Sequence, residues 1–124
     1  MHNLDRLAAH HAQRIIEATK SKKSSEVDNT ITKALGILQE DGVYACFLYL
    51  LAKEKENGKA VVKEMLGLLD GLGFDWGQPA DDNAETILKH VSDTVTVDLE
   101  RLLLAKETLE QMLIYARYGA KARD

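Results

Sequence analysis

The stretch RLLLAKETLEQMLIYARYGAKAR, residues 101 to 123, is the most regular part of the chain and decides the fold class. Its apolar residues recur every three or four positions, which is the period of one face of an α-helix. Charged residues such as Glu107 and Arg117 lie outside that face. The pattern predicts a last helix from about residue 95 to 120. Its buried seam is expected to contain Leu99, Leu102, Leu103, Leu109, Met112, Leu113 and Ala116.

Helical periodicity continues through the rest of the chain. Leu, Ala, Lys and Glu are abundant and there is a single proline, so intrinsic propensity also favours helix. The sequence therefore predicts an all-α fold, a compact bundle of five to six helices. Besides the last helix, we expect helices over residues 3–20, from Ser24 or Ser25 to Gly42, over 43–58, over 59–70, and a short one through Ile87, Leu88 and Val91.

Polar residues and glycines mark where these helices begin and end. Ser, Asn and Asp side chains cap helix N-termini, and glycine takes the left-handed conformation that ends a helix. Residues 92 to 98, SDTVTVD, are rich in β-branched side chains and predict a kink or a brief extended piece before the last helix. The expected caps and stops are Asn3, Ser24 or Ser25, Gly42, Asn57 with Gly58, and Asp81 or Asp82.

Length and composition indicate one folded domain over residues 1–124. The chain is 45% apolar and 29% charged, enough apolar surface for one shared core. No segment approaches the roughly 18 consecutive apolar residues of a membrane span, and the N-terminus lacks the apolar run of a signal peptide. Cys46 is the single cysteine and cannot form an internal disulfide. We expect a cytoplasmic protein.

Charge is distributed unevenly. The net charge is −4, so the whole molecule is not a polycation. Residues 1 to 23 nevertheless carry five cations against two acids, or +3, whereas residues 70 to 100 carry eight acids against one lysine, or −7. Ordinary helix faces exposed to solvent would be enough to produce this distribution. Alternatively, the molecule has unlike ends that could stack head to tail.

Catalytic and metal-binding patterns are scarce. His10 and His11 point about 100° apart on a helix and cannot share one metal from the same face. Cys46 has apolar neighbours, which is typical of a packed and inert thiol. No metalloprotease, nucleotide-binding or nucleophile-elbow pattern occurs. We therefore expect no enzyme activity, no metal and no cofactor, and an enzyme using His10 or His90 is the least favoured alternative.

Two basic segments are the best candidates for binding. KSKK, residues 20 to 23, and YARYGAKAR, residues 115 to 123, combine cations with flexible or aromatic surroundings, a composition typical of contacts with a nucleic-acid backbone. If the two segments were adjacent, they would form a stripe of about six to eight cations. Lys106 either extends from the edge of the core or faces a phosphate. The candidate RNA-binding residues are Arg14, Lys20, Lys22, Lys23, Lys106, Arg117, Lys121 and Arg123.

Two stretches resemble a known family. LGILQEDGVYACFLYLLAKEKENGKAVVKEMLGLLDGL, residues 35 to 72, resembles the centre of the small subunit of type III-B CRISPR effector complexes, the Cmr small subunit. A helix ends there in a polar residue and glycine, here Asp41-Gly42, and an apolar-aromatic helix and a leucine-rich helix follow. The last helix resembles that family's closing helix. The residues that carry the likeness are Leu48, Leu50, Leu51, Leu104, Lys106, Glu107, Leu109, Arg117 and Tyr118.

The resemblance implies a noncatalytic subunit of an antiviral ribonucleoprotein complex. Copies of such a subunit stack head to tail into a minor filament beside the guide RNA and help to hold the target RNA. The implied partners are other subunits of the CRISPR effector, further copies of the chain, and the backbones of guide and target RNA, with no membrane. The small subunit of the related Csm complexes, also a helical bundle, is an alternative within this class. A helical protein-protein adaptor or oligomerising regulator without nucleic-acid binding is the alternative from another class.

Overall fold

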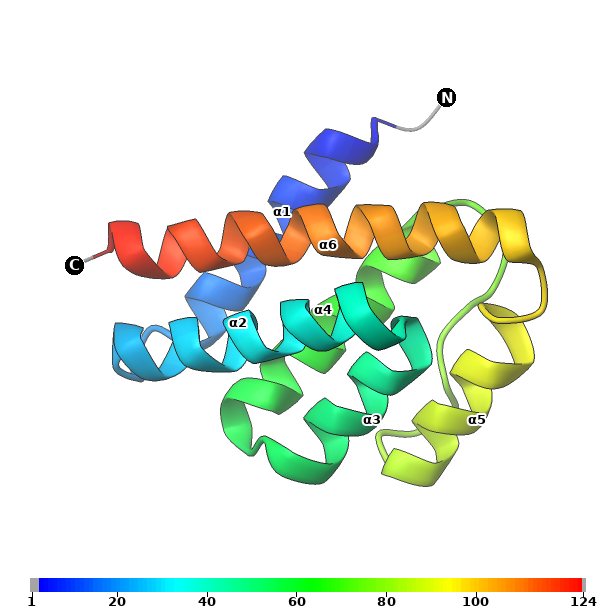
Figure 1. The fold of residues 1–124 in the computed structure, drawn as a ribbon, viewed down its shortest axis with the longest axis horizontal. Helices are drawn as coiled ribbons and strands as arrows, with labels where there is room; N and C mark the ends of the chain where they lie inside the picture. Colours follow the sequence, from blue (N-terminus) through cyan, green and yellow to red (C-terminus); the bar gives the residue numbers. More distant parts are fainter. Residues whose placement is uncertain (1–2, 124) are drawn as a thin grey trace.

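The computed structural model describes residues 3–123, and over these residues all regular structure is helical (Figure 1). The predicted all-α fold, a compact bundle of five to six helices, is confirmed. Within the described residues, no helix is both long and apolar enough to cross a bilayer. The helices are α1 (Leu4–Ala18), α2 (Ser24–Asp41), α3 (Val43–Lys53), α4 (Glu56–Gly71), α5 (Ala84–Thr94) and α6 (Leu99–Ala122).

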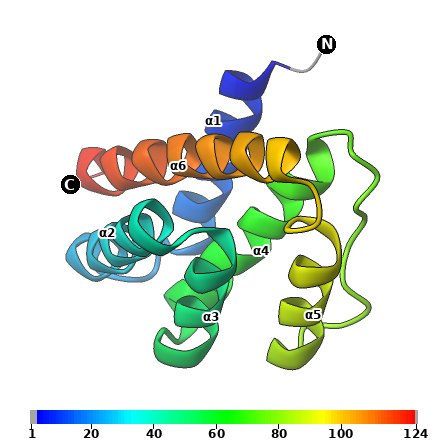
Figure 2. The same ribbon diagram turned by 45° about the vertical axis from the view of Figure 1, so that its right-hand side comes forward.

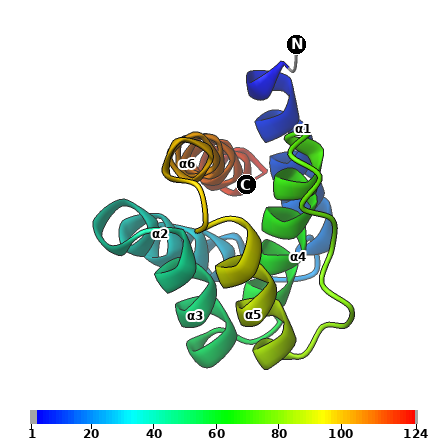
Figure 3. The same cartoon turned by 90° about the vertical axis from the view of Figure 1, so that its right-hand side faces the viewer.

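The longest helix, α6, organises the bundle. It runs antiparallel to α2, because Arg117 lies beside Asp28 near one end and Lys106 reaches Gln39 near the other (Figures 1 and 2). On its other side α6 is crossed by α1, which runs antiparallel to α4, because Gly67 faces His11 and Gly71 faces Leu7. Figure 3, a view along α6, shows α3 and α5 below it and α4 beside α1. The first and last helices are thus neighbours.

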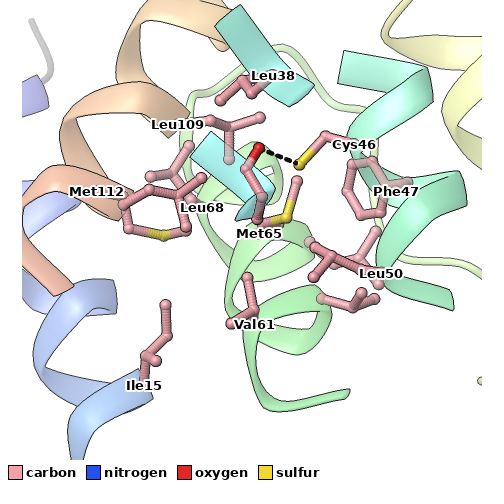
Figure 4. Packing of buried hydrophobic residues seen from close by; sticks show 14 of the residues in the cluster. Ile15, Leu38, Cys46, Phe47, Leu50, Val61, Met65, Leu68, Leu109 and Met112 are labelled. Atoms are coloured by element: carbon pink, nitrogen blue, oxygen red, sulfur yellow. Dashed lines mark hydrogen bonds between the residues drawn. The ribbon is translucent and has the colours of Figure 1, made fainter. Parts of the chain in front are cut away.

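The core lies where α2, α3, α4 and α6 meet (Figure 4). Phe47, Met65, Leu109 and Met112 are fully buried there. Each buried side chain of this size contributes about 1.5–3 kcal/mol through the hydrophobic effect, before the entropy of ordering is subtracted. Cys46 is also buried, as expected, and its thiol donates to the Ala34 carbonyl at 3.4 Å. This core fixes the helices that carry the surface cations.

Several helix boundaries follow the predicted signals. The Asn3 side chain accepts from the Arg6 amide at 3.0 Å and caps α1. Gly42 has a φ of 100° and ends α2, in the left-handed region that glycine tolerates. Two other predicted caps are wrong. Ser24 is the first residue of α2 and Lys23 occupies its N-cap position, while Asn83 and not Asp81 or Asp82 precedes α5.

The predicted stop at Asn57 and Gly58 is also wrong. α3 ends at Lys53, and α4 already begins at Glu56, so both residues lie within the first turn of α4. Gly58 serves close packing, because a Cβ on it would lie 2.4 Å from the Glu54 Cβ. The glycine allows the start of α4 to approach the end of α3. It therefore marks a tight contact and not a break in the helix.

The predicted seam of α6 is wrong at its start. Residues 95–97 form a turn, α6 begins at Leu99, and Leu99 and Leu103 are 67% and 55% exposed. Lys106 already lies opposite Gln39, close to where α2 ends, so the first turns of α6 extend past the helix that covers the rest of that face. From Ala105 onward the seam is buried.

The long loop between α4 and α5 folds back onto the bundle. Phe74 and Trp76 are partly buried against the core, with ring centroids 5.0 Å apart. The Arg101 guanidinium lies 4.8 Å from the Phe74 ring centroid, a cation–π contact that ties the loop to α6.

Candidate nucleic-acid interface

The two basic segments, residues 20–23 and 115–123, lie next to each other in the structure. Arg123, just after α6, hydrogen-bonds to the turn between α1 and α2. Its Nε donates to the Ser24 hydroxyl at 2.9 Å, and Nη2 donates to the Lys22 carbonyl at 2.6 Å. Nη1 donates to the carbonyls of Thr19 at 3.2 Å and Ile16 at 3.4 Å. We call the surface formed by this turn and the end of α6, with Lys20, Lys22, Lys23, Arg117, Lys121 and Arg123, the basic end.

The Arg123 contacts have a clear local cause. The last carbonyls of a helix have no partners within the helix, and α1 ends at Ala18. A guanidinium presents five N–H donors in one plane and can serve several such carbonyls at once. A cation at a helix C-terminus is also favoured by the helix dipole. Arg123 therefore holds the basic end together, and its donors are engaged within the protein.

Two lysines of the basic end pair with exposed acids. Lys20 Nζ lies 2.8 Å from Glu17 Oε1, and Lys22 Nζ lies 2.7 Å from Glu56 Oε2. The hydrogen bond with each glutamate, together with its charge, raises the pKa of the lysine. Exposed pairs of this kind are weak and screened by salt. Both lysines remain cationic and can exchange their carboxylate for a phosphate.

The other cations of the basic end differ in whether an acidic side chain lies close to them. Lys23 and Lys121 are exposed and make no ion pair within residues 3–123. Arg117 Nε lies 3.4 Å from Asp28 Oδ1, an ion pair without a hydrogen bond. Next to it, the Tyr118 side chain is 64% exposed.

Two predicted residues lie outside the basic end. Arg14 faces α4, where its Nε donates to Glu64 Oε1 at 3.0 Å. Lys106 lies near the end of α2, its Nζ donating to the Gln39 carbonyl at 3.3 Å. Along α6, Lys106 and Lys121 are separated by about 22 Å, from a rise of about 1.5 Å per residue. Lys106 therefore lies too far along α6 to share one patch with Lys121.

A buried glutamate links α1 to α4. Glu64 is 4% exposed, and its Oε1 lies 2.8 Å from His11 Nδ1 as well as 3.0 Å from Arg14 Nε. The His11 ring lies over Gly67, where a Cβ would be 2.9 Å from its Cε1. A buried carboxylate needs such partners to offset its loss of hydration. These contacts fix how α1 lies against α4.

Four exposed lysines around the start of α4 were not among the cations predicted from the sequence. Lys53, Lys55, Lys59 and Lys63 make no ion pair within the described residues. The segment AKEKENGKAVVK carries four lysines and two glutamates, but the acids alternate with the lysines and no run of consecutive cations marks it. The spacing of Lys59 and Lys63, four residues apart on a helix, was the available signal.

Other reactive groups are not arranged as a site in residues 3–123. Burial raises the pKa of the Cys46 thiol to about 12. Over the same residues, no three His, Cys, Asp or Glu side chains come together as a possible metal site. An open groove of about 380 Å³ between α1 and α6 is lined by Asp5, Ala9, Ala12, Gln13, Ile16, Tyr115 and Gly119.

Comparisons of the chain with protein-family models, with curated proteins and with solved structures return no match.

Proposed function

We propose that this protein is a noncatalytic small subunit of a type III, Cmr-like, RNA-guided CRISPR effector complex. In this role it stacks with its own copies into a minor filament, contacts other subunits, and stabilises guide and target RNA through their backbones. It acts in the cytoplasm as part of an antiviral ribonucleoprotein. The proposal starts from the resemblance of residues 35 to 72 and of α6 to that family.

The observation that carries the RNA-binding role is the joining of two basic segments about 100 residues apart in the sequence. Arg123 holds the α1–α2 turn beside the end of α6, so Lys22, Lys23 and Lys121 stand on one rigid surface. Cations at fixed positions bind phosphates with less loss of conformational entropy than cations on mobile termini. Their contacts would be to the backbone and would not read bases.

The charge distribution supports stacking. In Figure 1 the end of α6 and the α1–α2 turn lie at one end of the long axis, and α5 with the preceding loop lies at the other. The second end belongs to residues 70 to 100, which carry a net charge of −7 from eight acids and one lysine. Opposite charges at the two ends favour a head-to-tail contact between copies.

A salt titration of binding to a short RNA duplex tests the RNA-binding role. We expect affinity to fall steeply between about 50 and 200 mM salt, because bound phosphates release counterions. The variant Lys22→Glu/Lys23→Glu should bind more weakly and with a shallower salt slope. The matched control, Lys33→Glu/Lys89→Glu, makes the same change in net charge outside the basic end. Wild-type protein that does not bind at about 50 mM salt would contradict the role.

A specific observation favours the adaptor alternative. Val97, Leu99 and Leu103, at the turn before α6 and on its first turns, are 74%, 67% and 55% exposed. Tyr44 and Leu48 on the neighbouring α3 are also exposed. Apolar side chains of this size are costly in water and suit a protein contact. An adaptor would show association that depends on Leu99 and Leu103 and no RNA binding.

A further inference from the structure

We propose that the face of α4 carrying Lys59 and Lys63, with Lys53 and Lys55 before it, is a second surface that contacts RNA phosphates. We call these four residues the α4 lysine row. This inference rests on the proposed function and specifies where on the molecule the RNA lies. None of the four was among the cations selected from the sequence.

The fold separates the charges of this segment. Glu54 turns inward, where the Thr30 and Tyr49 hydroxyls donate to its carboxylate. Glu64 is likewise buried against α1. Glu56 is exposed but pairs with Lys22. The four lysines are all exposed and make no ion pair within residues 3–123, so a segment with four lysines and three glutamates over residues 53–64 presents a positive face.

The row stands on a rigid support. On the side of α4 away from Lys59 and Lys63, the helix buries Val61, Met65 and Leu68 in the core. Lys59 and Lys63 lie one helical turn apart, and a four-residue step advances about 6 Å along the axis. Lys59 and Lys63 are therefore cations at fixed positions on a helix held in place by the core, an arrangement suited to contacting successive phosphates.

The row continues to the basic end. Lys22 of the α1–α2 turn contacts Glu56 at the start of α4, which places the turn beside the first residues of the row. Arg14 on α1 is held by Glu64, the residue after Lys63, and its side chain is 52% exposed. An RNA backbone leaving the basic end could therefore pass along α4 and meet Arg14 on the way.

The chemistry of this face favours a polyanion over a protein partner. The large apolar side chains that the structure exposes within residues 3–123 lie on α3, on the α5–α6 turn and on α6, and none of them lies on α1 or α4. Protein interfaces concentrate aromatic and apolar residues and are depleted of lysine. A face of lysine and arginine without exposed apolar anchors fits phosphates instead.

The test compares three charge-reversal variants by fluorescence anisotropy with a labelled RNA duplex. They are Lys59→Glu/Lys63→Glu, Lys22→Glu/Lys23→Glu, and the control Lys33→Glu/Lys89→Glu, all with the same change in net charge. We expect the α4 variant to bind about tenfold or more weakly at low salt and to reduce the salt slope by about 2, one for each phosphate that is no longer neutralised. The control should stay near wild type. Circular dichroism melting checks that each variant folds.

The outcomes separate the inference from the proposed function. If wild-type protein binds and Lys22→Glu/Lys23→Glu weakens binding while Lys59→Glu/Lys63→Glu matches the control, the inference is wrong and the proposed function stands. If wild-type protein shows no salt-dependent binding, both are wrong. If the α4 variant weakens binding but Lys59→Gln/Lys63→Gln does not, repulsion by the new acids is the cause, and the inference is wrong as well.

Discussion

Arg123 has a structural role, although its place in a basic segment of the sequence suggested a cation free to bind RNA. Its guanidinium donates to three backbone carbonyls and to the Ser24 hydroxyl, joining the end of α6 to the α1–α2 turn. Sequence alone could not reveal this, because an arginine near the end of a basic segment looks the same whether it faces solvent or a helix terminus. The acceptors lie about 100 residues away and are supplied only by the fold.

Replacing Arg123 by alanine is expected to destabilise the protein by about 1.5–3 kcal/mol, because the α1 carbonyls lose charged hydrogen-bond donors. Arg123→Lys should recover only part of this loss, since an ammonium cannot reproduce the planar fork. Urea unfolding followed by circular dichroism measures the change. Lys121→Ala, at an exposed position, is the control and should stay within about 0.5 kcal/mol of wild type. Equal effects of the two alanine variants would contradict the role of Arg123.

Cys46 should make stability depend on alkaline pH. Burial raises its pKa from an ordinary value of 9.0 to about 12 in the folded protein. Above pH 9 the unfolded chain loses the thiol proton while the folded chain keeps it, so stability falls as pH rises through that window, by up to about 1.4 kcal/mol per pH unit. Comparing wild type with Cys46→Ala between pH 8 and 11 isolates this term. A constant difference between the two proteins over that range would exclude it.

The same burial predicts that the Cys46 thiol does not react in the native state. Thiolate is the reactive form, and both the raised pKa and the complete burial remove it. A chromogenic disulfide reagent should label Cys46 only after denaturant is added. Rapid labelling of folded protein would show that the core around Cys46 opens readily.

At the scale of single helices, two glycines have opposite roles. Gly36 lies within α2, and a Cβ there would meet nothing within 4 Å. On α4, a Cβ at Gly67 would lie 2.9 Å from His11 Cε1, and that ring is held by Glu64. Helix propensity favours alanine at both positions. Packing opposes alanine only at Gly67.

We therefore expect Gly36→Ala to stabilise the protein by up to about 1 kcal/mol. Gly67→Ala should destabilise it by about 1–2 kcal/mol, because the His11 ring must leave its hydrogen bond with Glu64 or α1 must shift away from α4. Thermal melts of the two variants beside wild type give the comparison. A rise in Tm for both would mean that the α1–α4 contact adapts without cost.

The type and order of the helices could be predicted from sequence because apolar periodicity is a local signal. Boundaries were harder where a residue serves a tertiary contact. Gly58 has the sequence signature of a stop, yet it lies within α4, because its missing Cβ lets Glu54 approach. Leu99 and Leu103 fit the spacing of the seam, yet they are exposed, because α2 ends before it can cover them. In both cases the deciding neighbour lies on another element.

At the scale of the whole molecule, the unlike ends lead to a prediction about self-association. Sedimentation velocity at low ionic strength should detect reversible oligomers that dissociate as salt is raised, because charges farther apart than about 10 Å are screened near 0.1 M salt. Asp81→Lys/Asp82→Lys should weaken them. Glu107→Lys/Glu110→Lys, on the body of α6, is the control. Oligomers indifferent to both salt and the loop variant would exclude charge-driven stacking.

The candidate site was predictable only in part, because tertiary contacts between distant residues decide which charges are paired. Summing charges over segments revealed a basic and an acidic region. Which cations stay free depends on acids contributed from far away, as when Glu64 engages Arg14 across 50 residues. The α4 lysine row shows the converse, since folding buries or pairs its acids and leaves its lysines exposed.

The placement of α6 has a consequence for biosynthesis. It covers both α1 and α2, and its contacts join residues about 100 positions apart, such as Tyr115 with Asp5. A growing polypeptide that has left the ribosome only through α5 therefore has two amphipathic helices with uncovered apolar faces. Such a chain is a natural client for chaperones during translation, and release from them should coincide with the arrival of the final helix.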